Sequence, residues 1–371
     1  MQFFLESTFL FATSVQVIFW LFLFSKLAFY KKTLNQSPES YPGLSIIICA
    51  RNAAEDLQRF LPKILQQNYP NFEVIVVNDQ SSDNSTQIIL DLQKKYPTLH
   101  LIEEREKLQP GKKGALSKGI LAANFELLLL TDADCFPNSN FWIDSFASVF
   151  SEKTAIVLGF SPYQKRENSF LNLFIRFETI YTATQYFSFA LAGMPYMGVG
   201  RNLAYTKSLF KEHQGFKDHL HIASGDDDLF ISQAANKGNT IINIDPEAFV
   251  YSVPKSSWKS YYYQKRRHLT TASHYSKSTQ WLLIFLAWSH WWHYLGALIL
   301  VIAIPSSLPL IGISYLVRIG IVSFQYWRIL GKLNDPGLRF WIPILDASYF
   351  LFYCLFAPAL IATGSNKKSW T

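Results

Sequence analysis

The chain has 371 residues, which is enough for one sizeable domain and additional segments. Hydrophobic residues make up 49% of it and aromatic residues 16%, a composition that is rich for a soluble protein and indicates contact with lipid. We assign the formal net charge of +7 to membrane topology and to attraction of anionic lipid, rather than to nucleic-acid binding. Three cysteines, Cys49, Cys135 and Cys354, provide no disulfide framework and suit a reducing cytoplasm.

The first apolar segment covers residues 8–30, in which Lys26 is the single charged side chain. It has about the length that spans the hydrocarbon core of a bilayer. A cleaved signal peptide is the alternative, but such a peptide opens with basic residues, whereas this chain begins MQFFLES. We therefore predict that residues 1–32 form an N-terminal transmembrane anchor.

The C-terminal part is also apolar, and no acidic residue occurs between Glu247 and Asp335. We predict a membrane region at 277–371 with about three transmembrane helices, placed near 282–303, 308–328 and 341–363. Because His290 and His293 lie in the first of these spans, the alternative is an interfacial helix at 277–293 followed by a span that starts near Tyr294.

Lysine and arginine residues orient these spans, because short basic loops stay in the cytoplasm. They cluster after the first and third spans and before the second, whereas the loop IPSSLP at 304–309 is uncharged. We predict a multi-pass protein of the cell (inner) membrane, with residues 31–280 in the cytoplasm and the IPSSLP loop outside. The basic tail NKKSW at 366–370 disagrees, since an even number of spans places it outside.

The segment between the membrane regions, residues 33–276, alternates short apolar runs with segments of helical period. Continuous apolar strands separated by helices predict an α/β domain with a largely parallel sheet that is covered on both faces. The predicted strands are 44–50, 72–78, 99–104, 127–131 and 155–160.

Polar side chains follow three of these strands, at the edge where such sheets bind ligands. Asp132 and Asp134 come directly after the run LLLLT, and residues two apart on an extended chain point to the same side. Two close carboxylates are suitable ligands for a divalent metal, Mg²⁺ or Mn²⁺. The alternative is that this Asp-Ala-Asp triplet caps the following helix.

Six motifs occur in the order and at about the spacing found in family 2 glycosyltransferases of the GT-A fold: SIIICARN, VVNDQSSDNS, GKKGALSKGI, LLTDADC, SGDDDLF and QKRRH. The resemblance covers roughly residues 44–270, and the flanking spans resemble those of bacterial membrane-bound members. It implies a Rossmann-like catalytic domain between transmembrane helices.

The resemblance also implies a nucleotide-sugar site in the first half of the domain. Asp79 would accept a hydrogen bond from the base, with Asp83 nearby, although a turn or helix cap is the alternative for Asp83. Lys112 would lie near the phosphates. The remaining contacts implied at this site are Arg51, Asn52 and Asp132. The turn after the first strand departs from the family pattern, because Ala53 stands where an acidic residue is frequent.

The second half of the domain resembles the acceptor and diphosphate side of the family. The segment MGVGRNLAYTK implies contacts from Gly200, Arg201 and Asn202, with a glycine-rich structural loop as the alternative. QKRRH resembles the motif Gln-x-x-Arg-Trp, with Gln264 and Arg267 in place. His268 stands in place of the motif's tryptophan. The alternative role for Lys265 and Arg266 is attraction of anionic lipid.

The triplet Asp226, Asp227 and Asp228 matches the position of the family's catalytic base. We assign Asp227 as the base and keep Asp226 as the rival. At least one of the three is expected to stabilise the start of the following helix instead.

The implied reaction is an inverting transfer of a sugar from a nucleotide diphosphate sugar, a UDP-sugar, to a hydroxyl group of a lipid-linked or glycan acceptor at the membrane. One alternative is a processive polysaccharide synthase, although about four spans are few for a polymer channel. The other is a non-catalytic membrane protein that binds sugar nucleotides. The expected partners are the donor, the acceptor and membrane lipid, with no nucleic acid.

Overall fold

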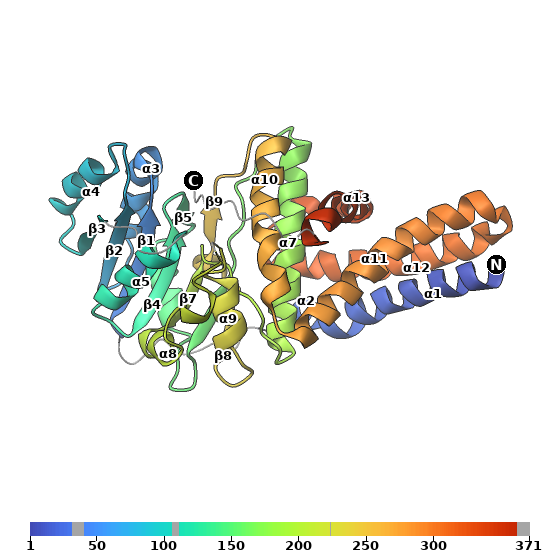
Figure 1. Cartoon of the computed structure of the whole chain (residues 1–371), viewed down its shortest axis with the longest axis horizontal. Helices are drawn as coiled ribbons and strands as arrows, with labels where there is room; N and C mark the ends of the chain where they lie inside the picture. The colour runs from blue at the N-terminus through green and yellow to red at the C-terminus, as the bar shows by residue number, and fades with distance from the viewer. Residues whose placement is uncertain (32–40, 106–110, 223, 362–371) are drawn as a thin grey trace.

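The computed structural model describes residues 1–31, 41–105, 111–222 and 224–361 (Figure 1). An α/β domain lies at one end of the molecule and a bundle of long helices at the other, with two upright helices between them. The predicted tail at 366–370 and the last residues of the predicted span 341–363 lie outside the described residues.

Within the described residues, seven strands form one sheet in the order β3-β2-β1-β4-β7-β6-β8. β7 runs antiparallel to both of its neighbours and the other pairs are parallel, which confirms the largely parallel sheet. The strands are β1 (Leu44–Ala50), β2 (Phe72–Asp79), β3 (Leu99–Glu104), β4 (Leu127–Asp132), β6 (Ile156–Gly159), β7 (Leu203–Thr206) and β8 (Thr240–Asn243). A separate pair is formed by β5 (Cys135–Pro137) and β9 (Val250–Ser252).

Both faces of the sheet are covered, as the continuous apolar strands predict. Alternate β1 residues enter different cores: Ile47 lies in the same core as Ile120 of α5 (Lys113–Ala122), whereas Ile46 lies in the same core as Leu61 of α3 (Ala54–Leu65). A side chain at Gly119 would lie 2.8 Å from Ile47 Cγ2, so this glycine lets α5 approach the sheet closely. The helices of the domain are α3 (Ala54–Leu65), α4 (Ser85–Gln93), α5 (Lys113–Ala122), α6 (Trp142–Ala147), α8 (Lys207–Glu212) and α9 (Asp228–Ala234).

Two helices stand between the sheet domain and the long helices: α7 (Phe170–Leu191) and α10 (Trp258–His268) (Figure 1). An ion pair between Lys265 and Glu178 joins them. Lys265 therefore has a structural partner within the domain, which the sequence pattern did not predict.

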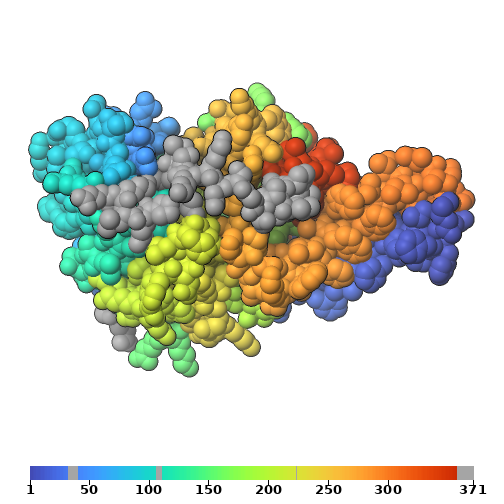
Figure 2. Space-filling model, viewed as in Figure 1, coloured from blue at the N-terminus to red at the C-terminus, as the bar shows by residue number. Residues whose placement is uncertain are grey.

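Within the described residues, four helices are long and apolar enough to cross a membrane, in agreement with the predicted spans: Gln2–Ala28, Lys277–Ala303, Pro305–Lys332 and Pro336–Phe356. They contain α1 (Gln2–Ile18), η1 (Phe19–Phe24), α2 (Ser25–Ala28), α11 (Lys277–Ala303), α12 (Leu308–Lys332) and α13 (Ile342–Ile361). α1 and α11 lie side by side along a projecting arm (Figure 2). Because α11 is one continuous helix, the structure favours a single span over a separate interfacial helix at 277–293.

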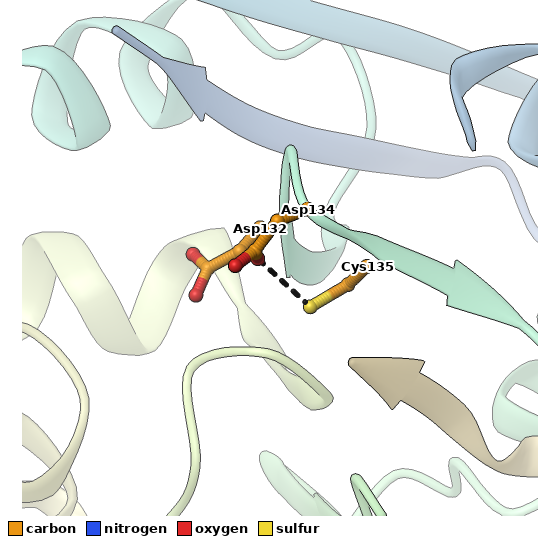
Figure 3. Close-up of side chains that lie close together, drawn as sticks. All are labelled: Asp132, Asp134 and Cys135. Carbon is orange, nitrogen blue, oxygen red and sulfur yellow. Dashed lines mark hydrogen bonds between the residues drawn. The ribbon is translucent and has the colours of Figure 1, made fainter. Parts of the chain in front are cut away.

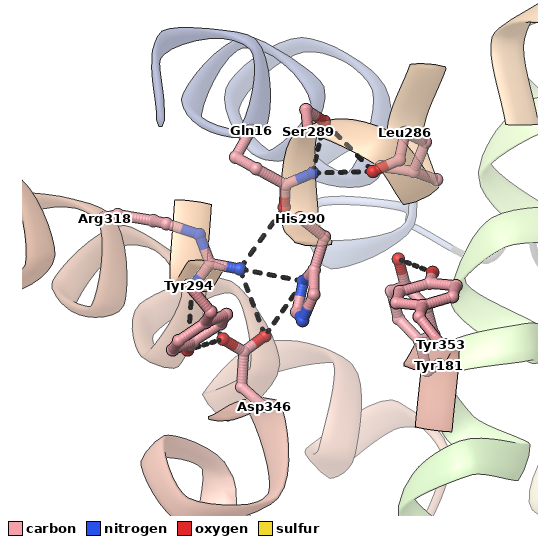
Figure 4. Close-up of polar contacts among 9 residues, drawn as sticks. All are labelled: Gln16, Tyr181, Leu286, Ser289, His290, Tyr294, Arg318, Asp346 and Tyr353. Carbon is pink, nitrogen blue, oxygen red and sulfur yellow. Dashed lines mark hydrogen bonds and ion pairs between the residues drawn. The ribbon is translucent and has the colours of Figure 1, made fainter. Parts of the chain in front are cut away.

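A buried polar cluster joins these four helices (Figure 4). Arg318 of α12 is fully buried, and its Nη1 donates to Asp346 Oδ2 of α13 at 2.6 Å. The hydroxyl of Tyr294 on α11 also donates to Asp346 Oδ2, at 2.6 Å, and Arg318 Nη2 lies 3.1 Å from His290 Nδ1. Gln16 on α1 accepts from Arg318 at 3.3 Å. Charged groups are costly in a bilayer unless they are paired in this way.

Candidate active site

The candidate site lies at the carboxyl edge of the sheet, where β1, β2 and β4 end beside the first turn of α5. Asp132 is the last residue of β4, and Asp134 lies in the turn before β5. Candidate ligand atoms of Asp132, Asp134 and Cys135 all lie within 4.8 Å of one another. Figure 3 shows both carboxylates on the same side of the turn, so the expectation from sequence holds although a turn, not an extended strand, brings them together.

The third member of this group, Cys135, is a poor ligand for a hard cation. Its Sγ donates to Asp134 Oδ1 at 3.3 Å and lies 2.9 Å from Ser252 Oγ of β9. Burial, followed by the charge of Asp134, raises the pKa of the Cys135 thiol well above its usual range, so the sulfur stays protonated. The two carboxylates are oxygen donors that fit Mg²⁺ or Mn²⁺, ions that commonly take further ligands from water and substrate phosphates.

Lys112 connects these carboxylates to the acidic triplet. Its Nζ forms an ion pair with Asp132 and lies 3.7 Å from Asp226 Oδ2. Burial alone would lower the pKa of Lys112, but Asp132 and Asp226 together raise it well above the usual value. For Asp132, burial acts to raise the pKa, and Lys112 outweighs it and lowers the pKa. The structure therefore brings three predicted site residues together, with Lys112 between Asp132 and Asp226.

The three aspartates of the triplet have different surroundings. Asp226 approaches Lys112, as described above. Asp227 accepts from the backbone N–H of Gly200 at 2.7 Å through Oδ2 and from that of Asp228 at 2.8 Å through Oδ1. Asp228 accepts from the hydroxyl of Tyr275 at 2.7 Å, and from that of Thr271. Asp228 thus ties the first turn of α9 to the segment before α11.

Burial also changes the acidity of Asp227. Burial, then the charges of Asp226 and Asp228, raise its pKa to about 7. The preceding Gly225 has a φ of 86°, and a Cβ there would lie 2.5 Å from Leu229 Cδ1. A glycine at this position lets the chain turn sharply into α9 and places consecutive aspartates in different directions.

The nucleotide-side residues follow β1 and β2. Asn52 has a φ of 48°, and its side-chain oxygen accepts from the N–H of Ser82 at 2.8 Å, which joins the two loops. Asp83 accepts from the N–H of Ala54, the first residue of α3, at 3.0 Å through Oδ2. This contact favours the helix-cap alternative for Asp83. Asp79 is buried at the end of β2, and Arg51 is half-buried directly after β1.

Two arginines predicted on the acceptor and diphosphate side of the site act on Asp132. After Lys112, Arg201 and Arg267 also lower the pKa of Asp132, which places both cations within electrostatic range of it. The guanidinium of Arg201 stacks 4.6 Å from the ring centre of Tyr163, whose hydroxyl accepts from Gln264 Nε2 at 3.4 Å.

Other residues predicted on this side differ in their surroundings. Asn202 is fully buried, and its amide donates to the carbonyls of Phe160 and Ala248 at 2.7 and 2.8 Å. That geometry favours a structural role for Asn202 over contact with an acceptor. Gly200 contributes its N–H to Asp227, while Arg266 and His268 are exposed on α10.

One buried charge at the site was missed by the sequence interpretation. Lys113 is fully buried in the first turn of α5, although the sequence analysis assigned a role only to its neighbour Lys112. The signal was its spacing: Lys113 shares the buried face of α5 with Leu116 and Ile120, at positions three and seven residues later.

Comparisons with known proteins identify relatives of the α/β domain. The family model described as "Glycosyl transferase family 2" matches residues 45–214. Poly-beta-1,6-N-acetyl-D-glucosamine synthase of Staphylococcus epidermidis is 36% identical over 92 residues, 25% of this chain and 22% of that protein. Probable glycosyltransferase YdaM of Bacillus subtilis is 25% identical over 244 residues, 63% of this chain and 56% of that protein. The chain therefore spans less than two thirds of the length of these curated relatives.

A solved structure shows the same fold. Mannosyltransferase PcManGT from Pyrobaculum calidifontis, in complex with GDP-Man and Mn²⁺, matches with a TM-score of 0.60 at 19% sequence identity. The likeness covers 94% of this chain and 99% of that one. Residues 45–214 match the family model of glycosyl transferase family 2, and the α/β domain has the GT-A fold predicted from the six motifs.

Proposed function

We propose that the protein is an inverting glycosyltransferase that moves a sugar from a nucleotide diphosphate sugar to a hydroxyl group of an acceptor at the membrane. The observation that carries this proposal is the placement of Lys112 between Asp132 and Asp226 at the carboxyl edge of the sheet, with Asp134 close to Asp132. The match to the family model supports it, because Lys112, Asp132 and Asp134 lie within the matched residues 45–214.

The donor would lie along the ends of β1, β2 and β4. Arg51, Asn52 and Asp79 border the place for the nucleotide, for which uracil is the proposed base. Asp132 and Asp134 would hold Mg²⁺ or Mn²⁺, which would supply positive charge for the diphosphate. Three cations of this chain surround the same place: Lys112, Arg201 and Arg267. This charge distribution favours a leaving group that becomes more negative as the reaction proceeds.

For the catalytic base, the geometry favours the rival, Asp226, over Asp227. Asp226 lies beside Lys112 and Asp132, where the transferred sugar would be held. Both oxygens of Asp227 accept backbone N–H groups, so that carboxylate is better suited to positioning the loop. In the proposed reaction the bond between the anomeric carbon and the diphosphate breaks. The acceptor oxygen bonds to that carbon from the opposite side, and its proton passes to Asp226.

The acceptor is proposed to be a lipid-linked glycan or a glycolipid. α10, which carries Gln264 and Arg267, stands between the sheet domain and the apolar helices (Figure 1). A donor site on one side of α10 and a bilayer on the other favour an acceptor that is anchored in lipid. The basic loops support a cytoplasmic catalytic domain in a multi-pass protein of the inner membrane.

A polysaccharide synthase is the second candidate. Its support is the 36% identity with the poly-beta-1,6-N-acetyl-D-glucosamine synthase of Staphylococcus epidermidis over 92 residues. A synthase would extend the same acceptor repeatedly, whereas a single-transfer enzyme would release it after one sugar. The length distribution of products formed with excess donor separates the two candidates.

The experiment for the proposed function measures release of nucleoside diphosphate by the full-length protein in lipid. UDP-sugars and GDP-sugars are supplied with Mn²⁺ and a membrane lipid extract as acceptor source. Asp134→Ala should abolish release and metal-dependent donor binding together, and EDTA should abolish release by the wild type. The matched control is Asp91→Ala, which removes an exposed carboxylate of α4 that is paired with Lys94. Full activity in EDTA would contradict the metal assignment, and binding without release would support the sugar-nucleotide sensor.

A further inference from the structure

Lys113 is a buried cation that the proposed mechanism does not use. Its side chain is fully buried, and its Nζ donates to the carbonyl of His219 at 2.6 Å and to that of Ile222 at 2.9 Å. Both partners belong to the segment that leads into the acidic triplet, and Ile222 precedes Asp226 by four residues. A buried ammonium group is expensive unless it is hydrogen-bonded and its charge is compensated.

The compensating charges come from the triplet itself. Burial lowers the pKa of Lys113 to about 8, and Asp226, Asp228 and Asp227 act against that effect. The titratable groups that face Lys113 are thus three carboxylates and the imidazole of His219, whose pKa burial and Lys113 lower to about 4. Lys113 donates to neutral backbone carbonyls of His219 and Ile222, and its charge offsets the negative charge of the acidic triplet that follows them.

Lys113 also occupies an unfavourable position for a simple surface lysine. It is the first residue of α5, where the positive end of the helix dipole repels cations. The helix itself is held against the sheet, since Gly119 leaves no space for a side chain beside Ile47. The first turn of α5 is therefore a fixed point from which Lys112 reaches Asp132 and Lys113 reaches the loop before α9.

From this geometry we propose that Lys113 is a positioning residue for glycosyl transfer, which fastens the segment at His219–Ile222 to α5 so that Asp226 faces Lys112 and Asp132. The inference rests on the proposed function. It assigns the two adjacent lysines different tasks: Lys112 lines the site, and Lys113 fixes the distance between the metal-side carboxylates and the proposed base. Small displacements of a catalytic group reduce turnover strongly, which is why a residue outside the site can matter.

The test uses Lys113→Met in the full-length protein, because methionine keeps much of the volume and removes both the charge and the donors. Amide hydrogen exchange at residues 217–222 should accelerate, and turnover should fall by about 10-fold to 100-fold while donor affinity stays near wild type. Removing a cation beside the triplet should also move the acidic limb of the pH–turnover profile to higher pH. A merely space-filling role would leave that limb in place.

Two comparisons keep the result interpretable. Lys118→Met is the matched control, because Lys118 lies on the same helix and pairs with Glu104 at the partly exposed surface. It should change neither the exchange at 217–222 nor the pH profile. Lys113→Arg retains the charge, so its acidic limb should stay near wild type even if its turnover is reduced.

Wild-type exchange at 217–222 together with wild-type turnover in Lys113→Met would overturn the proposal. If the wild type releases no nucleoside diphosphate, the proposed function fails, but hydrogen exchange still decides whether Lys113 fastens this segment. If Lys113→Met does not fold, Lys113→Arg decides the matter, because it retains the positive charge. An acidic limb of its pH–turnover profile that moves to higher pH would contradict the charge role of Lys113.

Discussion

Two ionic clusters of this protein contain similar groups but differ in accessibility and balance. At the sheet edge, Lys112 stands between Asp132 and Asp226, whose side chains are 34% and 17% exposed. In the helix bundle, Arg318 is 0% exposed and its partner Asp346 4% exposed. The first cluster has one cation between two carboxylates, whereas the second pairs one cation with one carboxylate and surrounds both with neutral polar groups.

The difference shows how similar charges can serve different purposes. A cluster that leaves carboxylate surface accessible is suited to take up a cation and a substrate. A cluster that is closed and balanced satisfies its own members and stabilises the helices that carry them. The exposure of the carboxylates therefore separates the candidate active site from the buried cluster of Arg318 and Asp346, although both contain aspartate and a basic residue.

The largest effect on stability is expected in the helix bundle. Arg318→Ala leaves Asp346 as an uncompensated buried charge and should lower the free energy of unfolding by about 3–5 kcal/mol. Replacing both partners, Arg318→Met with Asp346→Leu, should restore most of that loss. Thermal unfolding in lipid nanodiscs measures both variants. An equal loss in the single and double variants would show that the ion pair is not what holds the bundle together.

An effect on stability of intermediate size, which depends on pH, is expected at Asp227, because its folded-state pKa is about 7. A carboxyl whose pKa is raised on folding stabilises the protein below the unfolded-state value, and that stability is lost as pH rises through the folded-state value. Asp227→Asn cannot ionise, so its stability relative to wild type should rise between about pH 4 and about pH 7, by on the order of a few kcal/mol. Chemical denaturation at several pH values checks this. A difference that does not vary with pH would contradict the burial of Asp227.

The smallest effect on stability is expected at Asp228, whose carboxylate accepts hydrogen bonds from Thr271 and Tyr275. Tyr275→Phe removes one hydroxyl donor to its carboxylate while Thr271 remains, so the loss in stability should be about 1–3 kcal/mol. Turnover should change little at temperatures where the variant is folded, and thermal unfolding with a turnover assay measures both quantities. A large loss of turnover without a loss of stability would place Asp228 among the reacting groups.

Much of the sheet could be predicted from the sequence because its central strands are long and apolar. β1 and β3 have the predicted bounds, and β2 and β4 extend one residue further. The missed strands β5, β7, β8 and β9 have three or four residues each, too few to show a period. The antiparallel β7 in particular is specified by pairing with β4 and β6 rather than by its own composition.

Site residues could be predicted from the sequence where they come directly after a strand. They were harder to predict where a turn sets their surroundings. Asp132 and Asp134 come directly after a recognisable strand, so their position could be inferred. The different surroundings of Asp226 and Asp227 depend on the turn at Gly225 and on the N–H of Gly200, a residue distant in sequence. The burial of Asn202 depends in the same way on carbonyls of other elements.

The most direct measurement compares Asp226→Asn with Asp227→Asn, using calorimetry for donor binding and nucleoside diphosphate release for turnover. If Asp226 accepts the acceptor proton, Asp226→Asn should lose about 10²-fold to 10⁴-fold in turnover and keep near wild-type donor affinity. Asp227→Asn should retain more activity, because its carboxylate holds the backbone N–H groups of Gly200 and Asp228. An active Asp226→Asn beside an inactive Asp227→Asn would contradict this account and return the base to Asp227.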